Sequence, residues 1–274
     1  MRVSWLTGIG CSICCRRRGI DMTRLKGIAV PVVVLLLWEI LTRGNYLTLT
    51  SLSHPTAIGS AGYQLLLDGS LWRATRETFG AALGGMAIGA VCGIVAGVAF
   101  GLSRLLASLM RLSMESLRPV PSVALIPLAL LIYGYGYRME IAVVAFACFW
   151  PVVIVTESAV RGIEPRLLEV ARALKFPLIE RITKIILPAA LPRVFVGLRL
   201  AAAISLVVAV TVEITTNPIG LGYGLVVAQE SDRADRAFAF LGWIALLGWL
   251  LNALLLRAQT HWFGKLGNWA ESPR

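Results

Sequence analysis

Two uninterrupted apolar blocks constrain the fold of this chain more than any other feature of its sequence. Residues 79–102 are 24 consecutive positions without a formal charge, and residues 237–256 are another 20. A helix needs about 20 apolar residues to cross the hydrocarbon core of a bilayer, so each block is long enough. Over the whole chain 57% of residues are hydrophobic and 15% are charged, against roughly 25% charged in soluble domains. The sequence therefore predicts an all-α membrane protein and excludes a disordered chain, a disulfide scaffold and a soluble α/β enzyme.

Six stretches are candidate membrane spans. The block 79–102 is rich in glycine, and small residues four positions apart let helices approach closely in lipid. The stretch 194–216 contains Arg199 near one end and Glu213 near the other. In chain order, the predicted spans are residues 27–42, 79–102, 120–137, 141–156, 194–216 and 237–256.

The positive charges lie mainly on alternate sides of these spans. Of the 26 Lys and Arg residues, 19 lie in the two terminal tails and in the loops 103–119 and 157–193, and six lie in the opposite segments. Loops rich in Lys and Arg stay in the cytoplasm, so we expect both termini to be cytoplasmic. This retention of loops also accounts for the formal net charge of +11, and we expect no nucleic acid as a partner.

The five cysteines do not form a disulfide framework. Cys92 and Cys148 lie inside apolar stretches, where a thiol behaves as a small hydrophobe. The other three cluster within residues 11–15, without the second C-x-x-C or Cys/His pair that would complete a metal site. We therefore expect no metal and no cofactor, and we interpret residues 1–26 as a cytoplasmic tail, with Met22 as an alternative start of the chain.

The segment 157–193 is too long and too regularly patterned to be a plain connection between spans. Pro165 suits the first turn of a helix, and the residues after it place their apolar side chains on one face. A second amphipathic run follows Pro177 and should end at Pro188, because proline stops a helix. The pattern predicts two short cytoplasmic helices, which either dock on a partner or rest on the membrane surface.

Three motifs occur in chain order. Residues 169–174 (EVARAL) are followed by residues 186–192 (ILPAALP), residues 117–128 read LRPVPSVALIPL, and residues 217–223 read NPIGLGY. The first pair resembles the EAA loop of ABC importer permeases. The other two resemble the L-R-P-x-P-x-x-A-L-I-P-L run and the S-x-x-G-I/L-G-Y turn of the nitrate, sulfonate and taurine branch of that family. The resemblance covers about residues 28–257.

The resemblance implies the transmembrane domain of a type I ABC importer, with about six transmembrane helices in the bacterial inner (plasma) membrane. That domain would occupy residues 71–257, after a first transmembrane helix and external loop at 27–70 and before a cytoplasmic C-terminal tail at 258–274. The implied partners are cytoplasmic ATPase subunits, an external solute-binding protein, a second permease copy forming a homodimer, and membrane lipid. The solute would be small, such as nitrate, a sulfonate or taurine.

The same resemblance assigns coupling to the segment 157–193. In the family, the EAA loop is a coupling helix that inserts into a groove of the ATPase subunit, and exposed charges with apolar anchors suit such docking. The sequence has no Walker A motif G-x-x-x-x-G-K-[ST], so ATP would be bound by the partner and the chain is not expected to be an enzyme. Lys175 stands where the loop usually has glycine. The expected contact residues are Glu169, Val170, Ala171, Arg172, Ala173, Leu174, Lys175, Phe176 and Pro177.

Glu213 is the most prominent charge in an apolar segment. Ionisable residues within membranes are often functional, so Glu213 is a candidate for lining or gating the pore. Its position near the end of a span also fits a side chain that faces water or pairs with another helix.

Two other classes of protein stay open from the residues themselves. An ion-coupled secondary transporter would place paired ionisable groups near the middle of the membrane, and Glu213 has no evident partner in the sequence. A membrane-embedded enzyme would need a cluster of His, Asp or Ser side chains, whereas His54 and His261 are widely separated. Dependence on ATP separates the first alternative from an importer, and product formation separates the second.

Overall fold

The computed structural model describes residues 22–43, 52–117 and 119–263, and within these ranges the regular structure is helical throughout. The predicted N-terminal tail, with the cysteines at 11–15, lies outside the described residues up to residue 21, as does the C-terminal tail from residue 264. The chain divides into two compact units, Met1–Ala57 and Ile58–Arg274.

The first unit contains α1 (Met22–Arg43), which covers the first predicted span. Near its end, Glu39 pairs with Arg43 one turn later, with 2.6 Å between Oε1 and Nε. The Glu39 carboxylate also accepts hydrogen bonds from the backbone N–H of Thr56, at 3.1 Å, and from its hydroxyl, at 2.9 Å. Glu39 therefore satisfies a free N–H in the first turn of α2 (Pro55–Leu67).

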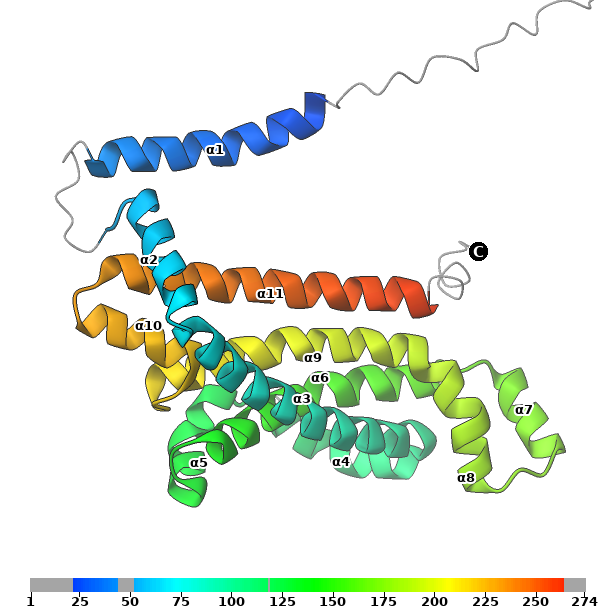
Figure 1. Ribbon diagram of the computed structural model, residues 1–274. Helices are drawn as coiled ribbons and strands as arrows, with labels where there is room; N and C mark the ends of the chain where they lie inside the picture. The colour runs from blue at the N-terminus through cyan, green and yellow to red at the C-terminus, as the bar shows by residue number, and fades with distance from the viewer. Residues whose placement is uncertain (1–21, 44–51, 118, 264–274) are drawn as a thin grey trace, which may run out of the picture. The chain divides into compact units, whose positions relative to one another are not determined.

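Four helical segments among the described residues are long and apolar enough to cross a membrane: Ser70–Leu102, Tyr137–Arg161, Leu178–Glu230 and Ala234–His261. They contain α3 (Ser70–Leu102), α6 (Tyr137–Arg161), α9 (Leu187–Thr215) and α11 (Ala234–Phe263). These segments correspond to the second, fourth, fifth and sixth predicted spans. Figure 1 shows α6 and α9 side by side, with α10 (Gly220–Glu230) at one end of α9 and α7 (Pro165–Ala173) at the other.

A stripe of glycines on α3 holds that helix against α6. Gly85, Gly89, Gly93 and Gly97 are all buried, and they recur every four residues, which places them on one face. A Cβ atom added at Gly85 would lie 2.6 Å from the Cβ of Val144, and one added at Gly97 would lie 2.6 Å from the Cβ of Thr156. The predicted close approach of small residues is thus confirmed.

The remaining helices complete two apolar cores. One core joins α3, α5 (Ile126–Tyr133), α6 and α9, with Val144, Val152 and Ala209 fully buried in it. The other joins α2, α10 and α11 to the start of α3. At that start, the indole N–H of Trp243 on α11 donates a 2.9 Å hydrogen bond to the Thr75 hydroxyl.

The structure corrects the prediction for residues 103–137. The segment expected as a cytoplasmic loop forms an amphipathic helix, α4 (Arg104–Leu117). Its mean hydropathy is low, so a search for apolar spans does not detect it. The predicted third span is shorter than expected: a 3₁₀ turn (Ser122–Leu125) leads into α5 (Ile126–Tyr133). This helix ends because Gly134 takes a positive φ of 70°, a backbone conformation that does not continue a helix.

The expected helix end at Pro188 is also wrong. Helical backbone continues from α8 (Leu178–Arg181) through a π-helical turn, η2 (Ile182–Ile186), into α9. Pro188 lies in the first turn of α9, where a missing N–H costs little. The wider π turn before it changes the hydrogen-bonding register, so the chain passes the proline without breaking the helix.

Candidate functional site

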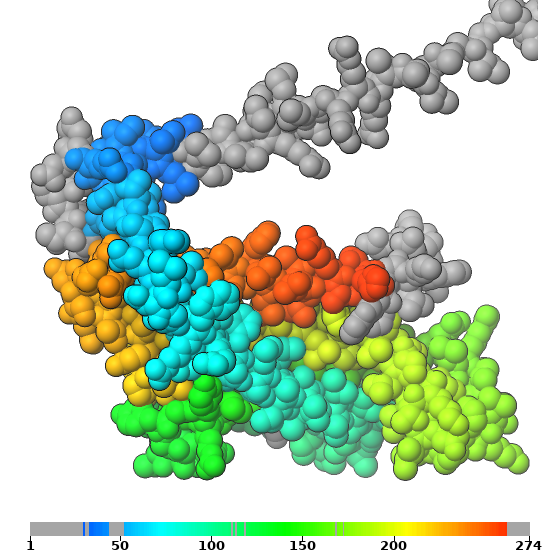
Figure 2. Space-filling model, in the orientation of Figure 1, coloured from blue at the N-terminus to red at the C-terminus, as the bar shows by residue number. Residues whose placement is uncertain are grey.

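The loop between α6 and α9 forms a helical hairpin at one end of the long helices. α7 (Pro165–Ala173) begins at the proline that the sequence singled out, and α8 follows Pro177. Figure 2 shows this α7–α8 hairpin, in green to yellow-green, protruding at the right-hand end of the second unit. The two short helices predicted for this segment are therefore present.

The α7–α8 hairpin rests on a buried base. Ala171 is only 1% exposed, and α7 contacts η2. Beneath the hairpin, Ile186 and Ala190 are buried in a cluster with Val160 and Val194 that joins the end of α6 to the start of α9. Because η2 is helically continuous with α9, the hairpin is attached to a long helix without a flexible joint.

Most of the predicted contact residues face away from this base. Val170 is 51% exposed and Leu174 58% exposed. Glu169, Ala173, Lys175 and Pro177 are exposed as well, whereas Phe176 is half-buried. The backbone of Arg172 lies in α7. The hairpin thus presents one acidic, one basic and two large apolar side chains on a helix end, which is a surface that suits docking to a protein groove.

Lys175 forms the turn between the two helices despite being a non-glycine residue. Its φ is +51°, in the left-handed region that L-residues other than Asn and Asp seldom adopt. The Phe176 N–H donates a 3.2 Å hydrogen bond to the carbonyl oxygen of Ala171. This bond from the residue after the left-handed position is the helix-ending Schellman arrangement, so the turn expected of glycine forms with lysine.

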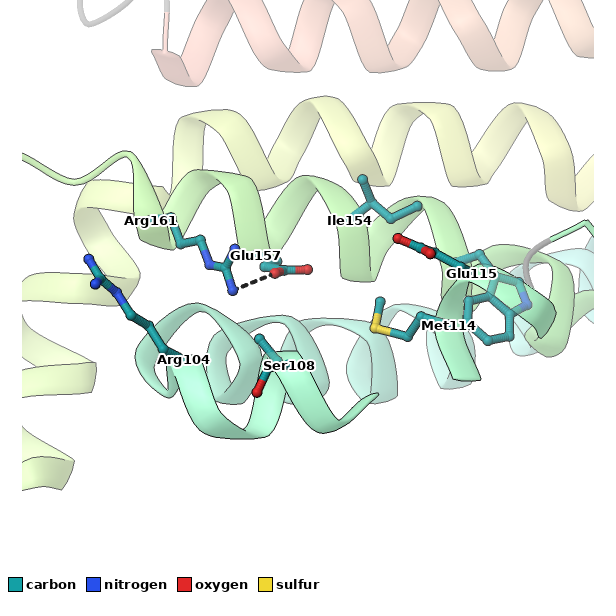
Figure 3. A pocket seen from close by; sticks show the side chains of 9 residues that line it. Arg104, Ser108, Met114, Glu115, Ile154, Glu157 and Arg161 are labelled. Carbon is teal, nitrogen blue, oxygen red and sulfur yellow. Dashed lines mark ion pairs between the residues drawn. The ribbon is translucent and has the colours of Figure 1, made fainter. Parts of the chain in front are cut away.

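Two neighbouring cavities run along one face of α6 and share Trp150 and Ile154. The first has a volume of about 470 Å³ and lies between α6 and α4. Figure 3 shows Arg161 and Glu157 on its α6 wall, joined as an ion pair at 2.9 Å, with Arg104 and Ser108 on α4 opposite them. The second, of about 360 Å³, is bounded by α6, α9 and the 3₁₀ turn before α5.

Glu213 lies at the opposite end of the long helices from the α7–α8 hairpin. It is 2% exposed, and its Oε2 accepts a 2.8 Å hydrogen bond from the N–H of Gly222 in the first turn of α10. Gly220 packs directly against the Glu213 carboxylate, where a Cβ atom would overlap an oxygen. The structure thus buries the Glu213 side chain against the first turn of α10, and its role in lining or gating the pore stays a prediction.

The sequence missed the groups that surround Glu213. Glu140, expected in a short linker between spans, lies in the first turn of α6 and is fully buried. Asn217 is also fully buried, and its amide N–H donates a 2.8 Å hydrogen bond to Glu140 Oε2. Thr78 of α3 accepts a 2.9 Å hydrogen bond from the N–H of Leu221. The available signal was a polar residue next to the end of a predicted span, Glu140 in one case and Asn217 in the other. Hydropathy alone does not identify the partner of such a residue.

Solved structures with this fold are the transmembrane parts of ABC transporters. One is an amino acid ABC transporter crystallised with histidines, with a TM-score of 0.56 and 15% identity, covering 70% of this chain and 92% of that chain. Another is the inward-facing MetNI methionine ABC transporter, with a TM-score of 0.57 and 20% identity, covering 72% of this chain and 96% of that chain. The helical fold is thus that of an ABC transporter transmembrane domain.

The sequence matches the family described as binding-protein-dependent transport system inner membrane component over residues 89–265. A putative aliphatic sulfonates transport permease, SsuC of Bacillus subtilis, is 31% identical over 241 residues, 87% of each chain. The nitrate import permease NrtB of Leptolyngbya laminosa is 27% identical, covering 83% of this chain and 84% of its own length. The taurine transport system permease TauC of Escherichia coli is 28% identical over 75% of this chain and 76% of its own.

This chain belongs to that family of inner-membrane components, and it is a multi-pass permease of an ABC importer for small solutes. Its relatives are transport permeases and not enzymes. The resemblance inferred from the three motifs is therefore confirmed, and neither the secondary transporter nor the membrane enzyme is the class to which the chain belongs.

Proposed function

We propose that the α7–α8 hairpin couples this permease to a separate cytoplasmic ATPase. The observation that carries the proposal is the hairpin's construction: an exposed helix end mounted on a buried base and continuous with α9. Glu169 and Lys175 supply exposed charges, and Val170 and Leu174 supply apolar anchors. A protein groove that takes up this end would bury the anchors and pair the charges.

The continuity of the helices gives the coupling a mechanical basis. A displacement of α7 passes to η2, which α7 contacts, and on to α9, which continues η2. It reaches α6 because Ile186, Ala190 and Val194 are packed with Val160. Closely packed interiors transmit displacement instead of absorbing it. ATP-driven closure of two ATPase subunits would thereby move α9 and α6 together and alternate the access to a central path.

We further propose that the two cavities along α6 belong to the path of the solute, and that a second copy of the chain closes this path in a homodimer. Trp150 and Ile154 lie at the junction of the cavities, and Arg104, Glu157 and Arg161 lie in the first one. A mixed lining of apolar and charged groups suits small polar solutes that must bind weakly and leave. The solute class is that named for the relatives, sulfonate, nitrate or taurine, delivered by an external binding protein.

The excess of Lys and Arg at the hairpin end supports an orientation in which both termini and the α7–α8 hairpin face the cytoplasm. Glu213 and Asn217 then lie at the outer end of the helices. In this orientation the hairpin is on the side where ATPase subunits are found, and membrane lipid surrounds the exposed apolar sides of α3 and α11.

The experiment that tests coupling compares two charge reversals in the tagged permease purified from membranes. We expect Glu169→Lys to release the ATPase subunit and to abolish ATP-dependent uptake. The control is Glu230→Lys, at another exposed glutamate, which ends α10, and this variant should retain the ATPase and uptake. Retention of a stoichiometric ATPase and normal uptake by Glu169→Lys would contradict the proposal.

A further inference from the structure

Two buried carboxyl groups meet at the end of the helices that lies away from the α7–α8 hairpin. Glu140 is 0% exposed and Glu213 is 2% exposed, and their carboxyl groups lie within hydrogen-bonding reach of each other. One oxygen of each, Oε1, has no hydrogen-bond partner among the described residues. The coupling of solute transport to ATP does not call for such a pair.

The other donors near these carboxyl groups are already committed. The Asn217 amide is held in one orientation, since its Oδ1 accepts a 2.9 Å hydrogen bond from the Gly136 N–H while its Nδ2 donates to Glu140 Oε2. The Gly222 N–H donates to Glu213 Oε2. The Thr78 hydroxyl also lies within hydrogen-bonding reach of the Glu213 carboxyl group, but it donates to the carbonyl oxygen of Ala74 at 3.1 Å. Oε1 of each acid is left without a hydrogen-bond partner among the described residues.

The charged groups that the structure describes around Glu140 and Glu213 add negative charge, and they provide no cation in contact with either carboxyl group. Glu77 of α3 lies within electrostatic range of both acids, accepts a 3.1 Å hydrogen bond from the Gly220 N–H and pairs with Arg73 at 3.2 Å. Tyr137 is the other titratable group nearby, and it lies within electrostatic range of both acids and of Arg76. No buried lysine or arginine among the described residues neutralises the two carboxyl groups.

Two carboxylates in contact and out of water cannot both stay ionised, because their repulsion is added to the cost of removing each charge from water. A single proton removes one charge and supplies the missing O–H donor at once. We propose that Glu140 and Glu213 form a proton-binding site, in which one shared proton latches the first turn of α6 to the end of α9.

The latch adds a polar link to two helices whose apolar faces already pack together at this end, through Met139 and Val143 of α6 and Val212 of α9. Glu213 anchors the start of α10 through Gly222, and Glu140 anchors the loop before α6 through Asn217 and Gly136. Loss of the proton leaves two negative charges in contact, which forces α6 and α9 apart at this end. The latch is therefore closed at low pH and opens as pH rises.

Infrared spectroscopy of the purified full-length permease detects the shared proton directly. The protein is placed in a maltoside detergent, which has no ester carbonyl, and the absorbance of protonated carboxyl groups is recorded at neutral pH in H₂O and D₂O. The variants are Glu140→Gln and Glu213→Gln, which preserve side-chain volume, with Glu157→Gln as the control. Glu157 lies on the same helix α6 and pairs with Arg161 at its other end.

We expect a protonated-carboxyl band in the wild-type and Glu157→Gln proteins, and its complete loss in each of the other two variants. A glutamine at either position donates an N–H to the remaining carboxylate, which then needs no proton. Absence of the band from the wild type, or its persistence in either Glu140→Gln or Glu213→Gln, would overturn the proposal. The measurement uses the permease without ATPase or solute, so its result is independent of the proposed coupling.

The pH dependence of the thermal unfolding midpoint is a second test, which still applies if the glutamine variants fold poorly. Glu140→Lys replaces the shared proton by a fixed cation next to Glu213. The thermal unfolding midpoint of the wild type should fall as pH rises from neutral to alkaline, while that of Glu140→Lys should not change. A wild-type midpoint that is independent of pH, or an equal fall in Glu140→Lys, counts against the latch.

Discussion

Gly89 on α3 and Ala145 on α6 lie so close together that a Cβ atom added at Gly89 would be 2.5 Å from the Ala145 carbonyl oxygen. The contact is between two backbones, so no side chain can move aside to relieve a larger residue. It lies in the middle of the glycine stripe that joins the two helices. The spacing of α3 and α6 depends on this contact.

Replacing Gly89 by alanine should therefore separate α3 from α6. We expect Gly89→Ala to lower the stability of the purified permease by about 1–3 kcal/mol, the usual cost of overpacking, seen as a lower thermal unfolding midpoint. Gly242→Ala is the matched control, because no atom lies within 4 Å of a Cβ added at that position in α11. Equal midpoints for the two variants would show that α3 and α6 are not in backbone contact.

Lys175 offers a test of the turn between α7 and α8. Lys175→Gly and Lys175→Ala both remove the ammonium group, but only glycine relieves the left-handed backbone, which costs an L-residue about 1–2 kcal/mol. We expect slower hydrogen exchange at the Phe176 N–H in Lys175→Gly than in Lys175→Ala. If the two variants exchange at the same rate, the turn does not carry that strain. A loss of ATPase binding common to both would instead report on the ammonium group.

Asn217 bridges Gly136 and Glu140, and its loss should be costly. Asn217→Ala leaves the half-buried N–H of Gly136 and a buried carboxyl oxygen of Glu140 without partners, at about 1–3 kcal/mol for a fully buried group. We expect a clear fall in the thermal unfolding midpoint. Asn252→Ala, at an exposed position on α11, should leave the midpoint unchanged. A stable Asn217→Ala protein would mean that water replaces the amide and that this end of the helices is wet.

Substitutions at two alanines of α7 distinguish the packing of the α7–α8 hairpin on its base from the binding of the ATPase. Ala171 is buried and Ala173 is exposed, so Ala171→Asp places a charge in the base of the hairpin and Ala173→Asp places one on its outer surface. We expect Ala171→Asp to make α7 sensitive to limited proteolysis. Ala173→Asp should leave proteolysis unchanged but weaken retention of the ATPase during purification. Normal retention by Ala173→Asp would remove that residue from the docking surface.

Several structural features could be predicted from the sequence because they depend on local periodicity alone. Gly85, Gly89, Gly93 and Gly97 form a stripe in any α-helix, whatever packs against it, and Pro165 marks a helix start by its own geometry. The helix end expected at Pro188 is wrong for the opposite reason. The effect of this proline on the helix depends on the π turn before it, and the hydropathy of residues 182–188 does not reveal a π turn.

The buried acids show a second limit of sequence analysis. Glu140 falls in the three-residue linker 138–140 between two predicted spans, together with the charged Arg138. The structure begins α6 at Tyr137 and thereby draws Glu140 into a helix that faces Asn217 and Glu213. Whether a charged residue at a helix boundary faces water or protein is a property of its neighbours in space, and these neighbours come from a distant part of the chain.

By itself, the sequence determined that this protein crosses a membrane as helices, since long uncharged blocks leave the backbone no partner in lipid except its own helix. Its motifs also determined the family and the position of the α7–α8 hairpin. Only the tertiary structure decided that Glu140 meets Glu213 and that Trp150 faces two cavities. Helix periodicity fixes which residues share a face, but which faces meet is decided by packing among segments far apart in the chain.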